Sequence, residues 1–166
     1  EWKKLGDIKD ITPEITKLFG YSRSEMVGEN LNLITPRIYQ GNLQEILFNT
    51  IMESAEVTSL NNNSIVFFRH KDGYLTLCSV MVFLVPSLND GLLFCFFMRK
   101  VDDEEDPFPK YKLPYFPGSP HYIIYNTETY AVHGVSKNCW TSFGIPSSLV
   151  EDMETEGEFL ITDVLP

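Results

Sequence analysis

Few residues of this 166-residue chain have the types and spacing that chemistry requires. Ser119 and His121 lie close together in the sequence, as a nucleophile and its base would, but geometry and not sequence adjacency makes such a pair. The cysteines, Cys78, Cys95 and Cys139, form no Cys-x-x-Cys motif and no Cys/His cluster. We therefore expect no zinc site and no disulfide framework, and the odd cysteine count favours a reducing compartment.

The carboxylates are concentrated in two runs. Residues 102–106 and 151–158 carry five negative charges each, which together equal the formal net charge of −10. We interpret both runs as solvated linkers or loops, with docking to a basic partner as the alternative. Solvated carboxylates are poor at acid–base catalysis, and the chain has no phosphate-binding glycine loop and no Gly-x-Ser-x-Gly motif. We expect no enzyme, and the absence of a basic stripe argues against nucleic-acid binding.

The clearest structural elements are three β-strands predicted between Ser64 and Val101. Asp72-Gly73 predicts a two-residue hairpin turn, and Asn89-Asp90-Gly91 predicts a second turn. Apolar residues occupy both faces of these strands, so one face can cover the core while the other must be buried against a flanking segment, a second domain or a partner chain. The expected interaction face, unless the two faces are reversed, carries Leu75, Leu77, Met81, Phe83, Leu93 and Phe97.

Short helices are predicted before the strands. Thr12-Pro13-Glu14 is typical of a helix start, and Ser22 and Glu25 have the spacing of a capping box. The expected elements are a strand over Leu5–Ile11, a helix from Pro13 to Gly20, a short helix from Ser22 to Gly28, a turn over Asn32–Thr35 and a longer helix over Ile38–Glu53.

The beginning of the chain recurs near its end. At a shift of 124 positions (132 − 8), Ile8 corresponds to Val132 and Thr12 to Ser136. After an insertion, residues 33–35 correspond to residues 160–162. We read the sequence as a piece of a longer protein with one domain over 1–103, an acidic, proline-rich linker over 104–120 and a second, truncated unit over 121–166.

Three segments resemble PAS domains. Residues 19–30 read Phe-Gly-Tyr-Ser followed by Glu-x-x-Gly-x-Asn, residues 6–8 read Gly-Asp-Ile, and residues 70–74 place Lys-Asp-Gly at a hairpin. The resemblance covers residues 5–101 well and 121–166 weakly. It implies an α+β fold with a five-stranded antiparallel sheet, short helices packed on one face of it, and a partial second PAS-like unit. With Pro-x-Ile-Tyr at 36–39, the chain is most similar to PAS modules of large multi-spanning membrane proteins of protists.

The resemblance also indicates which cofactors to consider. Flavin-binding PAS domains carry Cys within Gly-x-Asn-Cys-Arg-Phe-Leu-Gln, whereas Asn138 and Cys139 are followed here by Trp140 and Thr141, so we expect Cys139 to pack in the core. Haem-binding PAS domains use a histidine of the long helix, and residues 38–53 contain none. We therefore predict no cofactor and no metal. We expect His70 to be a solvated turn residue and His121 and His133 to have structural roles.

A PAS resemblance implies sensing or protein contact and no single reaction. We expect the chain to be a non-catalytic sensory or protein-interaction module of a larger signalling protein. The expected location is intracellular, on the cytoplasmic side of a membrane that other parts of that protein contact. The partner is a protein or flanking domain on the outer sheet face, a second copy of the chain included. One alternative is a purely architectural domain of a large assembly. The other is a small-ligand sensor with a pocket between the long helix and the sheet, with candidate residues Phe48, Met52, Phe67, Cys78 and Phe96.

Overall fold

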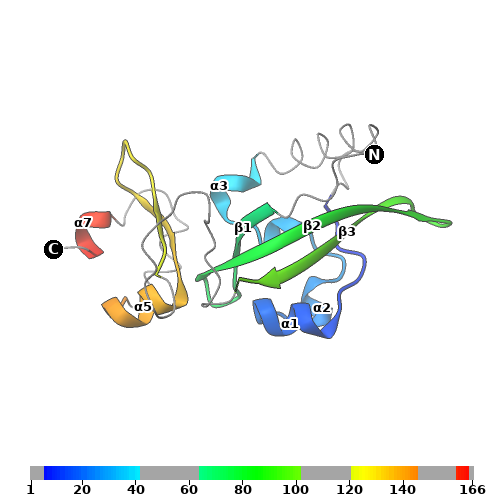
Figure 1. Ribbon diagram of the computed structural model, residues 1–166, viewed down its shortest axis with the longest axis horizontal. Helices are drawn as coiled ribbons and strands as arrows, with labels where there is room; N and C mark the ends of the chain where they lie inside the picture. The colour runs from blue at the N-terminus through cyan, green and yellow to red at the C-terminus, as the bar shows by residue number, and fades with distance from the viewer. Residues whose placement is uncertain (1–5, 42–63, 102–120, 146–159, 165–166) are drawn as a thin grey trace.

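Two antiparallel sheets and several short helices make up a mixed α+β arrangement (Figure 1). This computed structural model describes residues 6–41, 64–101, 121–145 and 160–164. The larger sheet has the order β1-β2-β3, and the smaller one pairs β4 with β5. The strands are β1 (Ser64–Arg69), β2 (Leu75–Ser87), β3 (Gly91–Lys100), β4 (Ile123–Tyr125) and β5 (Val132–Val135). The α+β class is confirmed, with the described strands in two sheets rather than in one of five strands.

The three strands predicted between residues 64 and 101 are present, but the first turn is longer than expected. Arg69 pairs with Leu75, and the His70 N–H donates to the Tyr74 carbonyl at 2.8 Å, which leaves three residues in the turn rather than two. Gly73 ends that turn with φ = 93°, and Gly91, the first residue of β3, has φ = 79° directly after the turn between β2 and β3. A glycine in the left-handed region is typical of three-residue hairpin turns.

The helices before the sheet begin and end close to the predicted residues. The first follows Thr12 and ends at Gly20, whose φ is 77°. The predicted capping box is confirmed, because the Ser22 N–H donates to Glu25 Oε2 at 2.8 Å. Only the first turn of the predicted 38–53 helix lies in the described part of the chain. The bounds are α1 (Pro13–Phe19), α2 (Arg23–Met26), η2 (Leu31–Leu33) and α3 (Arg37–Gln40).

The predicted strand over Leu5–Ile11 is wrong for the residues described, 6–11. Asp7 forms a single bridge with Asn30, and no strand is assigned here. The Ile8 N–H donates to the Glu29 carbonyl at 2.8 Å, and the Gly28 N–H donates to the Ile8 carbonyl at 2.9 Å. These backbone groups are therefore satisfied by the loop after α2 and not by a sheet.

One face of the larger sheet forms a core with α1, α2 and η2. The fully buried residues of this core include Phe19 of α1, Met26 of α2 and Cys78 of β2, and the rings of Phe19 and Phe68 lie 5.6 Å apart. The hairpin of β2 and β3 extends beyond these helices as an arm (Figure 1). The helices thus cover the sheet near β1 and leave the end of the hairpin projecting.

Residues 121–145 and 160–164 form a second, smaller core. Val135 of β5 and Cys139 of α5 (Lys137–Phe143) are fully buried there, with Val132 and Ile145 beside them. Ile161 of α7 (Ile161–Val164) packs against the same group. We call the described residues 6–101 the first unit and the described residues 121–164 the second unit.

The two units share backbone features at the offset of 124 residues. Gly6 and Tyr130 (6 + 124) both have positive φ, 98° and 61°. Helices α1 and α5 end at Gly20 and Gly144 (20 + 124), both in the left-handed region. The predicted recurrence of the chain's beginning is therefore visible in the backbone as well as in the sequence.

The predicted correspondence of residues 33–35 with 160–162 is wrong by three positions. The Leu31 N–H donates to the Gly6 carbonyl at 2.8 Å, and the Ile161 N–H donates to the Tyr130 carbonyl at 2.9 Å. These bonds match Leu31 with Ile161, an offset of 130 rather than 127. The cause is that the apolar pair Leu-Ile occurs at both 33–34 and 160–161 and gave a coincidental match.

Candidate interaction surface

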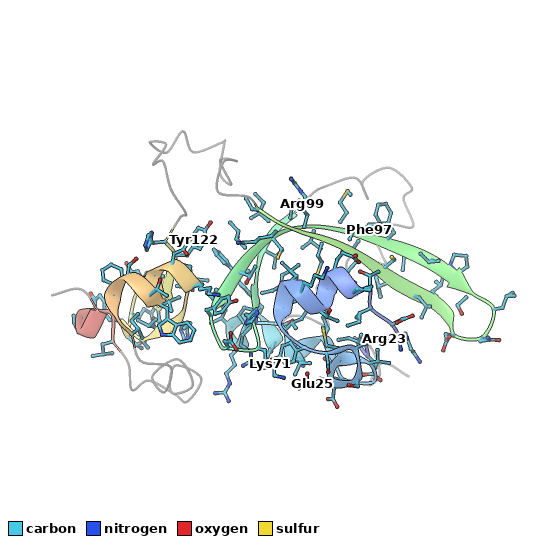
Figure 2. The ribbon with its side chains drawn as sticks, turned by 90° about the horizontal axis from the view of Figure 1, so that it is seen from below. Arg23, Glu25, Lys71, Phe97, Arg99 and Tyr122 are labelled. Carbon is cyan, nitrogen blue, oxygen red and sulfur yellow. The ribbon has the colours of Figure 1, made fainter. Side chains whose placement is uncertain are left out.

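The strand register decides which residues of the larger sheet lie on its outer face, away from α1 and α2. Cys78 and Val80 of β2 belong to the core, so their neighbours Leu77, Ser79 and Met81 point to the other side. Met81 pairs with Phe97 and Phe83 with Cys95, which places these β3 residues on the same outer face. Figure 2 shows Phe97 and Arg99 projecting from the sheet on the side opposite the helices. All six predicted interface residues, Leu75, Leu77, Met81, Phe83, Leu93 and Phe97, lie on this face.

The second unit covers the beginning of the outer face. Leu75 forms a parallel bridge with Ser136, and its side chain packs against Gly134, where an added Cβ would lie 2.7 Å from Leu75 Cδ1. The ring of Phe67 meets that of Tyr122 edge-on at 5.5 Å. Leu75 and Leu77 are both buried, at 4% and 3% exposure. These two predicted interface residues are therefore closed to an outside partner.

The far end of the outer face remains open on the hairpin arm. Phe97 is 58% exposed and Val85 42% exposed, while Met81, Phe83 and Leu93 are half-buried. Phe83 and Phe97 meet edge-to-face with ring centroids 5.4 Å apart, so each aromatic side chain holds the other in place. We call Met81, Phe83, Val85, Leu93 and Phe97 the distal outer patch. Exposed contiguous apolar groups of this kind mark contact sites.

The seam between the two units is built from aromatic rings that the sequence did not point to. The rings of Tyr74 and Trp140 lie 6.1 Å apart, and Lys137 Nζ lies 5.4 Å from the centre of the Tyr74 ring. His70 stacks on the other side of Tyr74 at 4.3 Å with an interplanar angle of 10°. In the sequence, these residues are recognisable only as aromatic side chains before and after the linker, and nothing there indicates that they meet.

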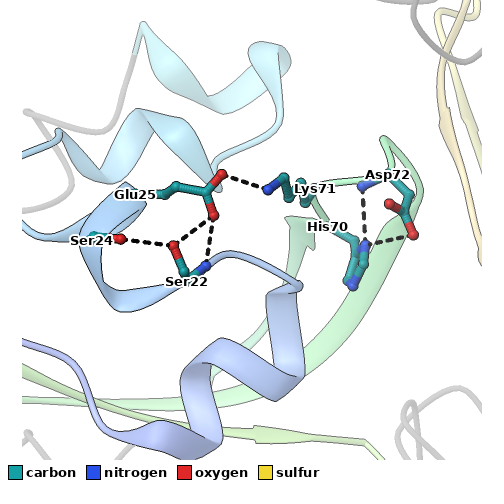
Figure 3. Close-up of polar contacts among 6 residues, drawn as sticks. All are labelled: Ser22, Ser24, Glu25, His70, Lys71 and Asp72. Atoms are coloured by element: carbon teal, nitrogen blue, oxygen red, sulfur yellow. Dashed lines mark hydrogen bonds and ion pairs between the residues drawn. The ribbon is translucent and has the colours of Figure 1, made fainter.

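The prediction that His70 is a solvated turn residue is wrong, because its side chain is only 12% exposed. Its ring lies against Gly20, where an added Cβ would be 2.5 Å from Cε1, and its Nδ1 accepts the Asp72 N–H at 3.1 Å. Burial lowers the His70 pKa, and Lys137 lowers it further, against an opposing effect of the Asp72 carboxylate. The neutral ring is therefore favoured, in agreement with its acceptor role (Figure 3).

A second polar contact ties the β1–β2 turn to α2. Lys71 Nζ binds Glu25 Oε1, while Oε2 of the same carboxylate accepts from Ser22 (Figure 3). The Lys71 hydrogen bond and then the Ser22 N–H lower the Glu25 pKa to about 2. The pair is exposed, so it orients the turn more than it stabilises it.

Neither of the two buried cysteine thiols is activated as a nucleophile, because both have raised pKa values. Cys78 is fully buried, and burial raises its pKa to about 12. Cys139 is also fully buried with a raised pKa, as expected for packing in the core. Within the described part of the chain, no group of three or more His, Cys, Asp or Glu side chains could hold a metal ion.

The predicted pocket residues do not gather at one place. Cys78 and Phe96 lie on the inner face, whereas Phe67 pairs with Leu77 on the outer face and contacts Tyr122. Phe67 therefore cannot line a pocket with the other two. Phe48 and Met52 lie outside the described residues.

Ser119, which lies near His121 in the sequence, is outside the described residues. His121 Nε2 instead lies 2.9 Å from Ser142 Oγ on the surface of the second unit. Both side chains are exposed, and none of the described carboxylates is bonded to the His121 ring. A triad needs a third group that orients the base, so this contact, between the segment before β4 and α5, has no catalytic geometry. His133 is an exposed residue of β5.

The chain was compared with family models and with curated protein sequences. No family model matches the chain, and no curated protein sequence does. None of the helices in the described part of the chain has the length and apolar character that crossing a bilayer requires.

Proposed function

We propose that the chain is a non-catalytic, PAS-type sensory and protein-interaction module of a larger signalling protein, and that its partner binds the distal outer patch. The observation that carries the proposal is the exposure of Phe97 and Val85 on the face of the β2–β3 hairpin that points away from the helices. The partner is a protein, a flanking domain or a second copy of the chain, on the intracellular side. Membrane association belongs to other parts of the larger protein.

The PAS assignment is supported by the order of the elements. Short helices precede three antiparallel strands, one face of the sheet is packed on those helices, and the Lys-Asp-Gly turn lies between β1 and β2. In the five-stranded sheet that a PAS fold implies, β1, β2 and β3 would be three neighbouring strands, and the opening hairpin would supply the other two. The second unit contains such an opening hairpin in β4 and β5.

The ligand-sensing alternative has less support from the contacts. The inner face near Cys78 is filled by Phe19, Met26 and Phe68, all buried, and well-packed interiors leave few voids. Native mass spectrometry and an absorption spectrum of the purified chain separate the two functions. A small molecule that stays bound to the chain would favour ligand sensing over contact through the patch.

The proposal is tested by replacing Phe97 with Ser. Burying a phenylalanine side chain contributes about 1.5–3 kcal/mol, so loss of Phe97 should weaken self-association by about tenfold or more if the partner is a second copy. Sedimentation velocity over a range of concentrations measures this, and precipitation by ammonium sulfate measures the accompanying gain in solubility.

The matched control is Phe143→Ser, which removes an exposed phenylalanine (49% exposed) from the second unit. It should leave both measurements unchanged. Equal effects of the two substitutions, or none from Phe97→Ser, would show that the distal outer patch is not a contact site.

A further inference from the structure

His70 lies at the seam between the two units and shares an aromatic neighbour with the second unit. Its ring stacks on Tyr74, with the ring centroids 4.3 Å apart and an interplanar angle of 10°. The same Tyr74 ring lies 6.1 Å from that of Trp140, and Lys137 Nζ of α5 lies 5.4 Å from its centre. A change in the charge of His70 therefore acts on the ring that the second unit contacts.

The hydrogen bond at His70 Nδ1 requires a neutral ring. Nδ1 accepts the Asp72 N–H at 3.1 Å, and a ring nitrogen that accepts a hydrogen bond cannot also carry a proton (Figure 3). The Asp72 carboxylate lies 3.4 Å from the same nitrogen, so a proton there exchanges the N–H partner for a carboxylate oxygen. Protonation of His70 thus changes the hydrogen bonding of the turn that leads into β2.

The described charged groups around His70 come from both units. In the first unit, Asp72 lies beside the ring, Lys71 is held in an ion pair with α2, and α1 meets the ring with the uncharged Gly20. Burial is the largest cause of the lowered His70 pKa, and Lys137 of the second unit lowers it further, against the raising effect of Asp72. Docking of the second unit supplies Lys137, whereas Asp72 is beside the ring with or without it. By linkage, a proton on His70 and the docked second unit therefore disfavour one another.

The other described contacts of the second unit with the larger sheet are confined to a small area. Leu75 forms a single parallel bridge with Ser136, and its side chain packs against Gly134. The Phe67 and Tyr122 rings meet edge-on. Two parts of one chain move relative to one another unless the interface between them is large and apolar. A seam of this kind can therefore be opened by an unfavourable charge at its border.

We propose that the seam is a pH-sensitive contact, in which protonation of His70 releases the second unit from the start of β2. The proton moves the Nδ1 hydrogen bond from the Asp72 N–H to the Asp72 carboxylate. It also places a second cation beside the ring that Lys137 contacts. Release uncovers Leu75 at the beginning of the outer face and leaves the core of the second unit intact. This response uses the seam and not the distal outer patch, so it stands independently of the proposed function.

The test is an NMR titration of the full chain from pH 8 to pH 5. The nuclear Overhauser effect between the Leu75 methyl groups and the Gly134 α-protons reports the docked seam, and the Hε1 shift of His70 reports its protonation. The Leu75–Gly134 signal should be lost in step with the His70 titration, while the signal between the Phe19 and Phe68 rings persists. A seam signal that remains after His70 is protonated, simultaneous loss of both signals, or a His70 ring that is still neutral at pH 5 would overturn the proposal.

Substitution of the histidine separates its protonation from other effects of acid. His70→Asn keeps a hydrogen-bond acceptor near the position of Nδ1 but takes up no proton, so the Leu75–Gly134 signal should persist at pH 5. The matched control is His133→Asn, at an exposed position of β5, which should lose the signal as the unchanged chain does. Loss of the signal at the same pH in His70→Asn and in the unchanged chain would overturn the proposal.

A second pair of variants tests the opposing charge and retains His70, so it remains decisive if His70→Asn fails to fold. Lys137→Gln should shift the midpoint of the His70 titration to higher pH, because the positive charge that docking supplies is gone. Lys9→Gln removes a positive charge beside Asp90, next to the start of β3, and should leave the midpoint unchanged. Equal midpoints in the two variants would contradict the linkage between docking and protonation.

Discussion

Helices α1 and α5 occupy equivalent positions in the two units and differ in what covers them. Phe19 at the end of α1 is fully buried against Phe68 of β1, whereas Phe143 at the end of α5 is 49% exposed. Both helices have a capping residue before them and a left-handed glycine after them. Local sequence therefore specifies the helix, and the packed sheet specifies whether its apolar residue becomes part of a core.

The largest expected effect comes from removing the buried member of this pair. Phe19→Ala should lower the free energy of unfolding by about 3–5 kcal/mol, because it leaves a cavity beside Phe68. Phe143→Ala should change it by less than about 1 kcal/mol. Urea unfolding followed by circular dichroism measures both. Similar losses would mean that Phe143 is buried in solution and that the two units are more alike than described.

The seam between the units gives the next largest effect. Gly134→Ala places a Cβ 2.7 Å from Leu75 Cδ1 and should cost about 1–3 kcal/mol. The clash involves a side chain, so the double variant Gly134→Ala/Leu75→Ala should recover part of the loss relative to the sum of the single changes. Gly41→Ala, where the added Cβ meets nothing within 4 Å, is the control. A purely additive double variant would show that the seam is not formed in solution.

Stability should depend on pH through His70, which lies on the first unit's side of the seam. Burial lowers the His70 pKa in the folded chain, so the folded state binds fewer protons than the unfolded state near the normal histidine pKa of about 6.5. The contribution of His70 is therefore present above that pH and is lost as the pH falls below it. Thermal unfolding between pH 8 and pH 5 should show a decline that His70→Asn reduces and that His133→Asn, at an exposed position, leaves unchanged.

The smallest effect concerns the position of positive φ in the recurrent turn, which is a glycine in the first unit and a tyrosine in the second. Tyr130 has φ = 61° where the first unit has Gly6, and a side chain in this region costs about 1–2 kcal/mol. Replacement by glycine removes this strain but costs about 0.5–1 kcal/mol, because glycine is more flexible in the unfolded chain. Tyr130→Gly should thus raise the free energy of unfolding by about 1 kcal/mol or less. Tyr125→Gly in β4 should lower it, and a loss in both variants would contradict the turn's equivalence to that of Gly6.

The sequence predicted the strands of the larger sheet and the helix ends well because those features have local causes. Left-handed glycines end α1 and the β1–β2 turn and begin β3, and period-two alternation assigned the faces of β2 and β3. The three-residue turn before Leu75 was missed because Asp72-Gly73 is compatible with both turn lengths.

Contacts between distant segments were not predictable in the same way. Gly134 and Tyr122 lie in the seam because of how the second unit sits against β2, and neither belongs to a periodic pattern. Two of the six predicted interface residues, Leu75 and Leu77, are buried and so do not belong to an exposed surface. Phe67 was wrongly included among the predicted pocket residues, because it was chosen by residue type and its position on the outer face of β1 was not considered.

The position of Cys95 has a practical consequence. Cys78 and Cys139 are fully buried, whereas Cys95 is half-exposed and pairs with Phe83 on the hairpin arm. A maleimide dye or spin label applied to the native chain should therefore attach at residue 95 before the other two thiols become accessible. The chain thus carries a natural labelling position from which fluorescence or electron paramagnetic resonance can report on the arm without engineered cysteines.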